Sequence, residues 1–182
     1  MVQKEFQPNK TPKQVFKEGA FGGTYFRPIY SSVTGRHYSS SQVIKEYPKS
    51  WFQGIDIKTM VTSPDYNKNI NKYNVKCGSS LQTWEEKNWI VKEDPYGWFQ
   101  WYCRYYLGRR SDDDERQIKR WLALAGPNGR FRRRLMNQII KQKKRYNDYS
   151  VSPVIRQVLL HWGYELTSED LKIYKRERGR IN

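Results

Sequence analysis

Apolar residues recur every three to four positions through much of the second half of the chain. The clearest case places four of them at the spacing of one helix face: Ile118, Trp121, Leu122 and Ala125. Gly126–Gly129 ends that segment, and the same spacing predicts a second helix over 130–145. A third helix is predicted to start at Ser152-Pro153 and end at Gly163, and a fourth to follow Thr167 and end near Gly179.

The segment before Ser111 carries aromatic side chains at helical spacing. Asp94-Pro95 is a helix-start signal and Gly108 a stop signal, so a helix is predicted over 96–107. Its aromatic residues are Trp98, Phe99, Trp101, Tyr102, Tyr105 and Tyr106. An apolar face this wide favours a central packing helix over the alternative, an exposed platform on which nucleic-acid bases stack.

The first half of the chain shows shorter and less regular patterns. Thr11-Pro12 predicts a short helix ending at Gly19, and a serine at 79 or 80 is expected to cap another. Residues 20–60 are expected to hold a small extended or hairpin region that packs on the aromatic helix. The predicted fold is mainly α, one domain of about six short helices over residues 11–178, with flexible termini at 1–10 and 179–182.

Composition narrows the class of protein. The 182 residues carry 34 Lys and Arg against 18 Asp and Glu, a net charge of +16, and 15% of them are aromatic. Disordered basic tails are poor in aromatic residues, so a folded basic protein is predicted. No apolar run approaches the length of a membrane span and no secretory signal is present, so we expect no membrane association. An intracellular location (nucleus, cytoplasm or virion) is expected, without secretion.

Cysteine and histidine are too few for most cofactor chemistry. Cys77, Cys103, His37 and His161 are the only such residues, and none lies at a zinc-binding spacing. We therefore expect no metal and no cofactor. Cys77 could be a nucleophile at the start of a helix, but a buried structural cysteine is the favoured interpretation.

The helix predicted over 130–145 carries only basic charges. Its cations lie opposite an apolar stripe and could contact the phosphates of a nucleic acid, DNA or RNA. Arginine suits phosphate well, although arginines in a first helical turn oppose the helix dipole, which suggests that they serve a partner. The predicted nucleic-acid-binding residues are Arg130, Arg132, Arg133, Arg134, Lys141, Lys144, Arg145, Arg109 and Arg110.

Two motifs are compatible with this region, and both are weak. Three successive helices permit a helix-turn-helix with 130–145 as the recognition helix. Gly126–Gly129 also matches the GxxG loop of a KH module, which in addition requires strands around its helices.

Two other classes of function stay open. The acidic residues 112–115 could bind Mg²⁺ in a nucleic-acid-processing enzyme, of nuclease or glycosylase type, although acids in a first helical turn already favour the helix dipole. A protein-interaction module for an acidic partner would also explain the net charge of +16.

Four blocks of the sequence are long enough to be specific. They are FGGTYFRPI (21–29), DPYGWFQWYCRYYLGRR (94–110), DDDERQIKRWLALAGPNGRF (112–131) and SPVIRQVLLHWGYEL (152–166). Together they resemble an uncharacterised family of fungi, algae and large DNA viruses. The resemblance implies that residues 20–166 form one unit, and it brings no activity or site residues. The function predicted from the residues is non-enzymatic nucleic-acid binding.

Overall fold

The computed structural model describes the backbone of residues 2–181 and the side chains of residues 4–179. This described part is mainly helical, as predicted, with one two-stranded hairpin and 3₁₀ turns between the helices. The helices are α1 (Pro12–Glu18), α2 (Ser40–Ile44), α3 (Ile57–Met60), α4 (Leu81–Glu86), α5 (Trp98–Tyr106), α6 (Asp114–Leu124), α7 (Arg130–Lys141), α8 (Pro153–His161) and α9 (Ser168–Ile181). The strands are β1 (Ile29–Ser31) and β2 (Arg36–Tyr38).

Local signals explain several helix boundaries. Thr11 accepts a hydrogen bond from the Gln14 amide while the Gln14 side chain accepts one from Thr11 N–H, a capping box that starts α1. Thr167 and Asp170 form the same reciprocal arrangement at α9. Ser80 caps α4 through the Thr83 amide. These three starts agree with the sequence prediction.

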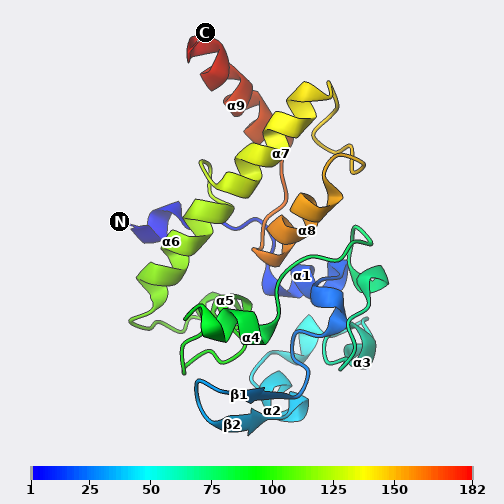
Figure 1. The fold of residues 1–182 in the computed structure, drawn as a ribbon, viewed down its shortest axis with the longest axis vertical. Helices are drawn as coiled ribbons and strands as arrows, with labels where there is room; N and C mark the ends of the chain where they lie inside the picture. The colour runs from blue at the N-terminus through cyan, green and yellow to red at the C-terminus, as the bar shows by residue number, and fades with distance from the viewer. Residues whose placement is uncertain (1, 182) are drawn as a thin grey trace.

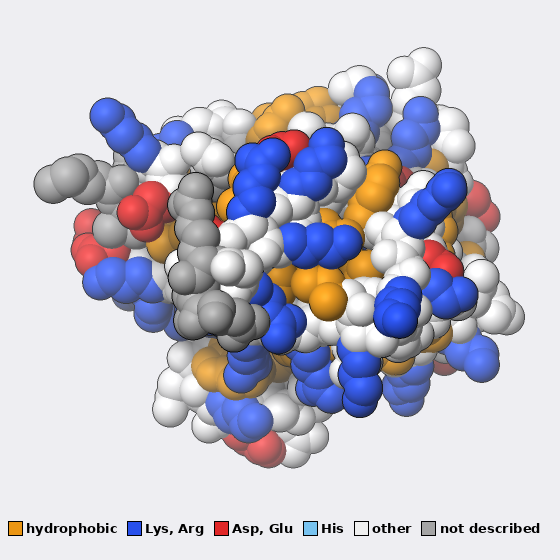
Figure 2. Space-filling view, turned by 90° about the horizontal axis from the view of Figure 1, so that it is seen from above, with side chains coloured by type: hydrophobic (Ala, Val, Ile, Leu, Met, Phe, Trp, Pro, Cys, Tyr) orange, Lys and Arg blue, Asp and Glu red, His pale blue; other side chains and the backbone are white. Residues whose placement is uncertain are grey.

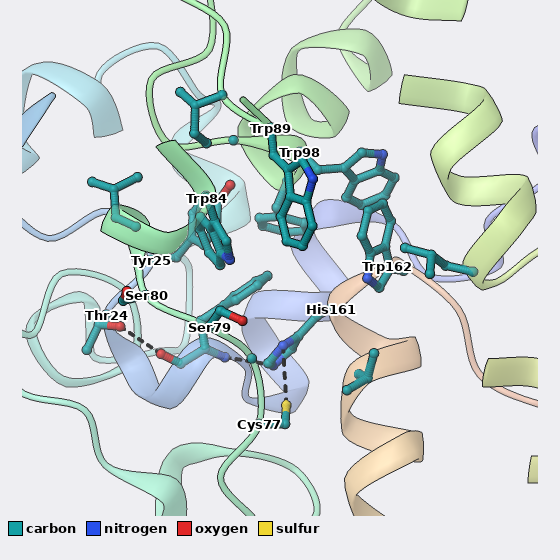
Figure 3. Close-up of a pocket in the computed structure, with 18 of the residues that line it drawn as sticks. Thr24, Tyr25, Cys77, Ser79, Ser80, Trp84, Trp89, Trp98, His161 and Trp162 are labelled. Atoms are coloured by element: carbon teal, nitrogen blue, oxygen red, sulfur yellow. Dashed lines mark hydrogen bonds between the residues drawn. The ribbon is translucent and has the colours of Figure 1, made fainter. Parts of the chain in front are cut away.

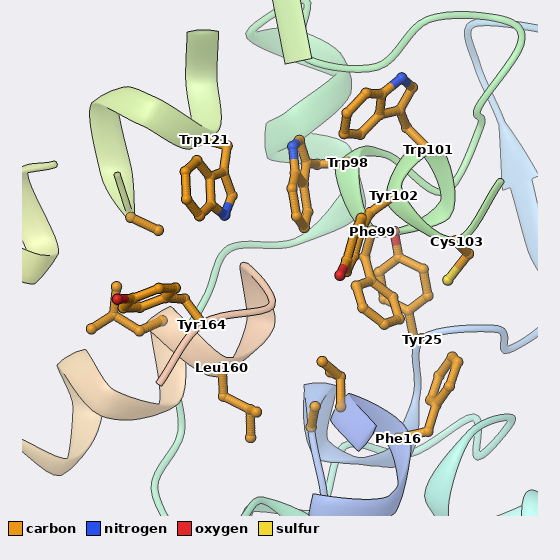
Figure 4. Close-up of a cluster of buried hydrophobic side chains, with 14 of the residues drawn as sticks. Phe16, Tyr25, Trp98, Phe99, Trp101, Tyr102, Cys103, Trp121, Leu160 and Tyr164 are labelled. Atoms are coloured by element: carbon orange, nitrogen blue, oxygen red, sulfur yellow. The ribbon is translucent and has the colours of Figure 1, made fainter. Parts of the chain in front are cut away.

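Helix α5 lies at the centre of the molecule, as its aromatic pattern predicts. Trp101, Cys103 and Phe99 are at most 2% exposed, and the side chains around them close a continuous aromatic core (Figure 4). Helices α7, α8 and α9 lie at one end of the molecule and the hairpin with α2 at the other (Figure 1). Helix α5 therefore lies between the end that carries the hairpin and α2 and the end that carries α7, α8 and α9.

The region predicted to be extended packs on α5. Strands β1 and β2 pair antiparallel with Ile29 opposite Tyr38. Before the hairpin, the Tyr25 hydroxyl donates to Tyr96 O at 2.8 Å and accepts from Gln100 N at 2.9 Å. This buried hydroxyl is the hydrogen-bond partner of two backbone groups at the start of α5. The N–H groups of a first helical turn have no acceptor within the helix, so the Gln100 amide depends on this contact.

Two predicted helix boundaries differ from the structure. Helix α7 ends at Lys141 rather than near 145, because Lys143 has a positive φ of 53° that an α-helix cannot continue. Lys144 and Arg145 therefore lie in the following loop. Helix α5 starts at Trp98, after Gly97 with φ 93°. A Cβ on Gly97 would meet only the end of the Ile90 side chain, at 2.9 Å, so the backbone conformation is what favours glycine there.

The described part of residues 1–10, a segment predicted to be flexible, contacts the core. Phe6 contacts five aromatic rings edge-on, those of Trp98, Trp101, Tyr102, Tyr105 and Trp121. Lys10 N–H donates to Gly163 O at 2.9 Å. Sequence spacing missed this segment because one aromatic residue, rather than a periodic stripe, attaches it. At the other end α9 continues through Gly179 to Ile181. The prediction for residues 1 and 182 lies outside the described residues.

Four charged side chains form a closed ring of ion pairs between distant segments. Lys10 contacts Glu18 and Glu165 at 2.6 Å each, and Lys72 contacts the same two carboxylates at 2.6 and 3.0 Å. Burial alone would raise the pKa of Glu165, but hydrogen bonds and charges from Lys10 and Lys72 outweigh it and lower that pKa. The ring ties the N-terminal segment to α1 and to the loop after α8.

Within residues 2–181, none of the helices combines the length and the apolar character that a membrane crossing requires.

We predict that Glu165→Gln lowers the free energy of unfolding by about 2 kcal/mol, because it leaves Lys10 and Lys72 with one carboxylate between them. Glu177→Gln, an exposed glutamate in α9, should leave stability unchanged. Because the folded pKa of Glu165 lies below its unfolded value, its contribution is present at neutral pH and lost as pH falls below about 4.3. Urea titrations across pH 3–7 should therefore show the free energies of unfolding of the native protein and of Glu165→Gln converging in acid. A difference that stays constant with pH would contradict the role of the ring.

Candidate functional site

Helix α7 separates an apolar side from a cationic side. Leu135, Met136 and Ile139 are at most 2% exposed and face the core, while Arg133 and Arg134 are exposed. The turn before it holds α7 against α6. A Cβ on Gly126 would lie 2.7 Å from Leu122 O, and one on Gly129 would lie 2.5 Å from the Leu124 carbonyl carbon. These glycines therefore serve helix packing, and the strands that a KH module needs around its helices are not found among the described residues.

A group of exposed cations on α7 and the loop after it has no carboxylate partner in the described chain. We call this group the basic surface: Arg130, Arg133, Arg134, Lys141, Lys143 and Arg145. Figure 2 looks onto the end of the molecule that carries α7 and α9, where Lys and Arg far outnumber Asp and Glu. Lys144 differs from its neighbours because it pairs with Asp148 at 3.4 Å.

Helix α9 extends the cationic end. The Tyr174 hydroxyl donates to Asn137 Oδ1 at 2.9 Å, and Arg178 donates to the same oxygen at 3.0 Å, so α9 lies against α7. Lys175 and Arg176 are exposed beside them. Helices α7 and α9, which are separated by α8 in the sequence, thus contribute to one cationic face.

The structure removes two predicted binding residues from this face. Arg132 is buried, pairs with Asp170 and lies 4.5 Å from the Tyr164 ring centroid. Arg109 forms a two-pronged ion pair with the buried Asp94, at 2.7 and 2.6 Å. Both arginines form ion pairs that stabilise the fold. Their sequence context alone could not distinguish this role from phosphate binding.

Arg110 is exposed but occupied locally. Its guanidinium lies 3.8 Å from the Tyr105 ring centroid and donates to the carbonyl oxygens of Tyr105 and Arg109. It belongs to the turn between α5 and α6 and not to the basic surface.

The acidic residues 112–115 do not converge. Asp114 is buried and accepts hydrogen bonds from Trp101 Nε1 at 2.8 Å and from Ser111. Asp113 pairs with Arg116, and Glu115 with Lys119. The described residues contain no cluster of three or more potential metal ligands. These carboxylates start α6 and anchor α5, and their geometry gives no support to the Mg²⁺-dependent enzyme.

The sequence analysis missed an aromatic cavity of about 770 Å³ beside the first turn of α7. Its size falls within the range of ~300–1,000 Å³ common for small-molecule sites. We call it the aromatic cavity; its walls include Trp84, Trp89, Trp98, Trp162, Phe21 and Phe131. Figure 3 shows the indole rings gathered around it, with Trp84 and Trp162 on opposite sides. Arg27, Arg120 and Arg130 also line it, and none of the described lining residues is Asp or Glu.

Arg120 is a half-buried charged residue that lines this cavity. Its guanidinium lies 5.5 Å from the ring centroids of both Trp89 and Trp162, and it donates to Gln117 Oε1 at 2.9 Å. Burial, with a smaller contribution from the neighbouring Arg116, lowers the pKa of Arg120 to about 10. The group still carries its charge at neutral pH, in surroundings that disfavour it.

Cys77 and His161 meet at the floor of the cavity with Sγ and Nδ1 3.6 Å apart (Figure 3). His161 Nε2 accepts from Phe21 N–H at 2.9 Å, and Gln157 Nε2 lies 3.1 Å from it. A ring nitrogen that accepts these bonds carries no proton, so the proton is on Nδ1, which points to the sulfur. His161 therefore cannot take the thiol proton, as a catalytic Cys–His pair would require.

Burial reinforces this conclusion. It raises the pKa of Cys77 to about 12 and lowers that of His161 to about 3, so both groups are neutral at physiological pH. The absence of a lining carboxylate also leaves the cavity without the acid or base that a glycosylase would use. The geometry gives no support to a nucleophilic Cys77–His161 pair.

The sequence did contain a signal for the aromatic cavity. Each of the four blocks that carry the resemblance contributes lining side chains, such as Arg27, Trp98, Arg120 and Trp162. The spacing of the aromatic residues predicted that they lie in the core. Spacing along one helix does not show which of these rings face rings of another element across a cavity.

Comparison with protein-family models, with curated proteins and with solved structures gave no match.

We predict that iodoacetamide at about pH 8 alkylates the native protein at least about 100-fold more slowly than the unfolded chain, because Cys77 is almost entirely protonated and Cys103 is buried. Mass spectrometry of quenched samples follows both cysteines, and the chain in guanidinium serves as the fully reactive control. Rapid modification of Cys77 in the native protein would show an activated thiolate and contradict the assignment of the Nδ1 proton.

Proposed function

We propose that this protein binds nucleic acid through the phosphate backbone, using the basic surface on α7. The observation that supports it best is the group of exposed arginines and lysines without carboxylate partners in the described chain. Two other cations of α7 and its loop are paired: the buried Arg132 with Asp170, and the exposed Lys144 with Asp148. A helix face whose exposed cations have no carboxylate partner among the described residues is suited to a polyanionic partner.

The dimensions of α7 fit such a partner. From Arg130 to Lys141 the helix extends about 16 Å, since each residue adds about 1.5 Å. A nucleic-acid strand spans nearly five steps of about 3.4 Å over that distance. Gly129 provides no side-chain cap, so the positive end of the helix dipole adds to the charge of Arg130.

Phosphate contacts carry no sequence information, so the proposal is for binding that depends on charge and salt rather than on base sequence. Both DNA and RNA have the required chemistry. An acidic protein is the competing partner, and nuclease-treated protein that ignores nucleic acid but retains a protein ligand would favour it.

We predict that the triple variant Arg133→Glu, Arg134→Glu, Lys141→Glu binds nucleic acid at least about 30-fold more weakly than the native protein at low salt, because three phosphate contacts become repulsive. Fluorescence anisotropy with labelled single- and double-stranded DNA and RNA measures the dissociation constants.

The matched control reverses three exposed lysines at the opposite end of the molecule, Lys45, Lys49 and Lys58. It changes the net charge equally, so a similar loss in both variants would assign binding to overall charge. Native affinity in the α7 variant would exclude the basic surface.

A further inference from the structure

The aromatic cavity combines flat walls with access to solvent. Trp89 is 36% exposed and Tyr66 is 38% exposed, although both line the cavity with Trp84 and Trp162. Indole side chains of this size normally bury most of their surface when they serve only the core. Several aromatic rings that converge on one open cavity offer stacking surfaces to a planar ligand.

Arg120 indicates the charge of that ligand. Arg104 and Arg109 each pair with Asp94, and the buried Arg156 donates to three backbone carbonyl oxygens. Arg120 has one good acceptor, Gln117 Oε1, and a contact of 3.5 Å to Trp89 O. Its remaining N–H groups are available to an anion at the cavity wall.

The other two arginines of the cavity agree with this charge. Arg27 donates to Thr24 O at 3.1 Å, and neither Arg27 nor Arg130 pairs with a carboxylate of the described residues. Aromatic cages that bind methylated lysine need the opposite charge, because their ligand is a cation. Here Arg120 lies over two of the indole rings and would repel such a ligand.

We propose that the aromatic cavity binds a nucleotide, with the base stacked among the indole rings and a phosphate on Arg120. A free mononucleotide and an unpaired nucleotide of a strand share this chemistry. The proposal goes beyond the basic surface and does not depend on it, because Arg133, Arg134 and Lys141 do not line the cavity. A long-chain fatty acid would satisfy the charge but would not use the flat walls.

The test is isothermal titration calorimetry of the full chain at low salt with AMP, GMP, CMP, UMP, adenosine, inorganic phosphate and palmitate. At least one mononucleotide should bind, and AMP should bind about 10-fold or more tightly than adenosine, because only AMP reaches Arg120 with a charge. Inorganic phosphate should be about 100-fold weaker than AMP, because it cannot stack.

Two variants distinguish recognition of the phosphate from recognition of the base. Arg120→Gln should weaken AMP about 10-fold and leave adenosine unchanged. Trp89→Ala, at a partly exposed ring, should weaken both by about 10-fold, while Trp89→Phe should retain most of the affinity. The matched controls Lys119→Gln on α6 and Tyr30→Ala on β1 lie outside the cavity and should behave like the native protein. Thermal melting confirms that each variant is folded.

Oligonucleotide arms distinguish the source of the nucleotide. A 5′-phosphorylated single strand whose affinity falls in Trp89→Ala would identify a strand nucleotide; binding of mononucleotides with no effect of Trp89→Ala on the strand would identify a free one. The triple variant of α7 should match its lysine control for AMP, so loss of strand binding alone would leave this proposal standing.

Three results would overturn the proposal. The first is no binding of any mononucleotide at millimolar concentration in properly folded protein. The second is an equal effect of Arg120→Gln on AMP and adenosine. The third is binding of palmitate without binding of any nucleotide, which would assign the cavity to a lipid-like anion.

Discussion

The packing of α5 is the constraint on which the remaining structure depends. Its rings fill the centre of the molecule, and Phe6, α1, α6 and α8 all bury side chains against them. The same helix forms part of the aromatic cavity. The Trp98 and Trp162 ring centroids lie 4.4 Å apart with the rings tilted by 45°, and Trp98 Nε1 donates to Gln117 O. Core and cavity thus share a wall. A site built on such elements keeps its geometry without a bound ligand.

The fold also determines which charged side chains form ion pairs. Carboxylates are scarce, and many of them pair with cations that tie distant segments together, as in the ring formed by Lys10, Lys72, Glu18 and Glu165. Asp94 alone engages both Arg104 and Arg109. Cations without a carboxylate partner among the described residues lie on α7, at the aromatic cavity and elsewhere on the surface, as with Lys45, Lys49 and Lys58. Buried pairs contribute specificity to folding, whereas unpaired exposed cations contribute little to stability and much to association.

Local patterns predicted the helices well and the candidate sites only in part. The caps of α1, α4 and α9 and the burial of α5 follow from spacing and chemistry within one segment. The role of Arg132 does not, because Asp170, its partner, lies 38 residues away on another helix. The aromatic cavity was missed for the same reason: Trp84, Trp98 and Trp162 come from three elements that meet only in the folded chain. Phe6 likewise looked isolated in the sequence and is half-buried among rings from two helices.

The two candidate sites are adjacent, since Arg130 and Phe131 begin α7 and also line the aromatic cavity. A strand that follows α7 would reach the cavity at the first turn of the helix. Arg130 thus belongs to both candidate sites.

The most direct test of nucleic-acid binding is a salt titration of the nuclease-treated native protein against single- and double-stranded DNA and RNA. Six unpaired cations on the basic surface predict a plot of log K against log salt with a slope of about −4 to −5 for the preferred ligand. No binding at low salt, or binding that salt does not weaken, would contradict the account and leave the positive charge to an acidic protein partner.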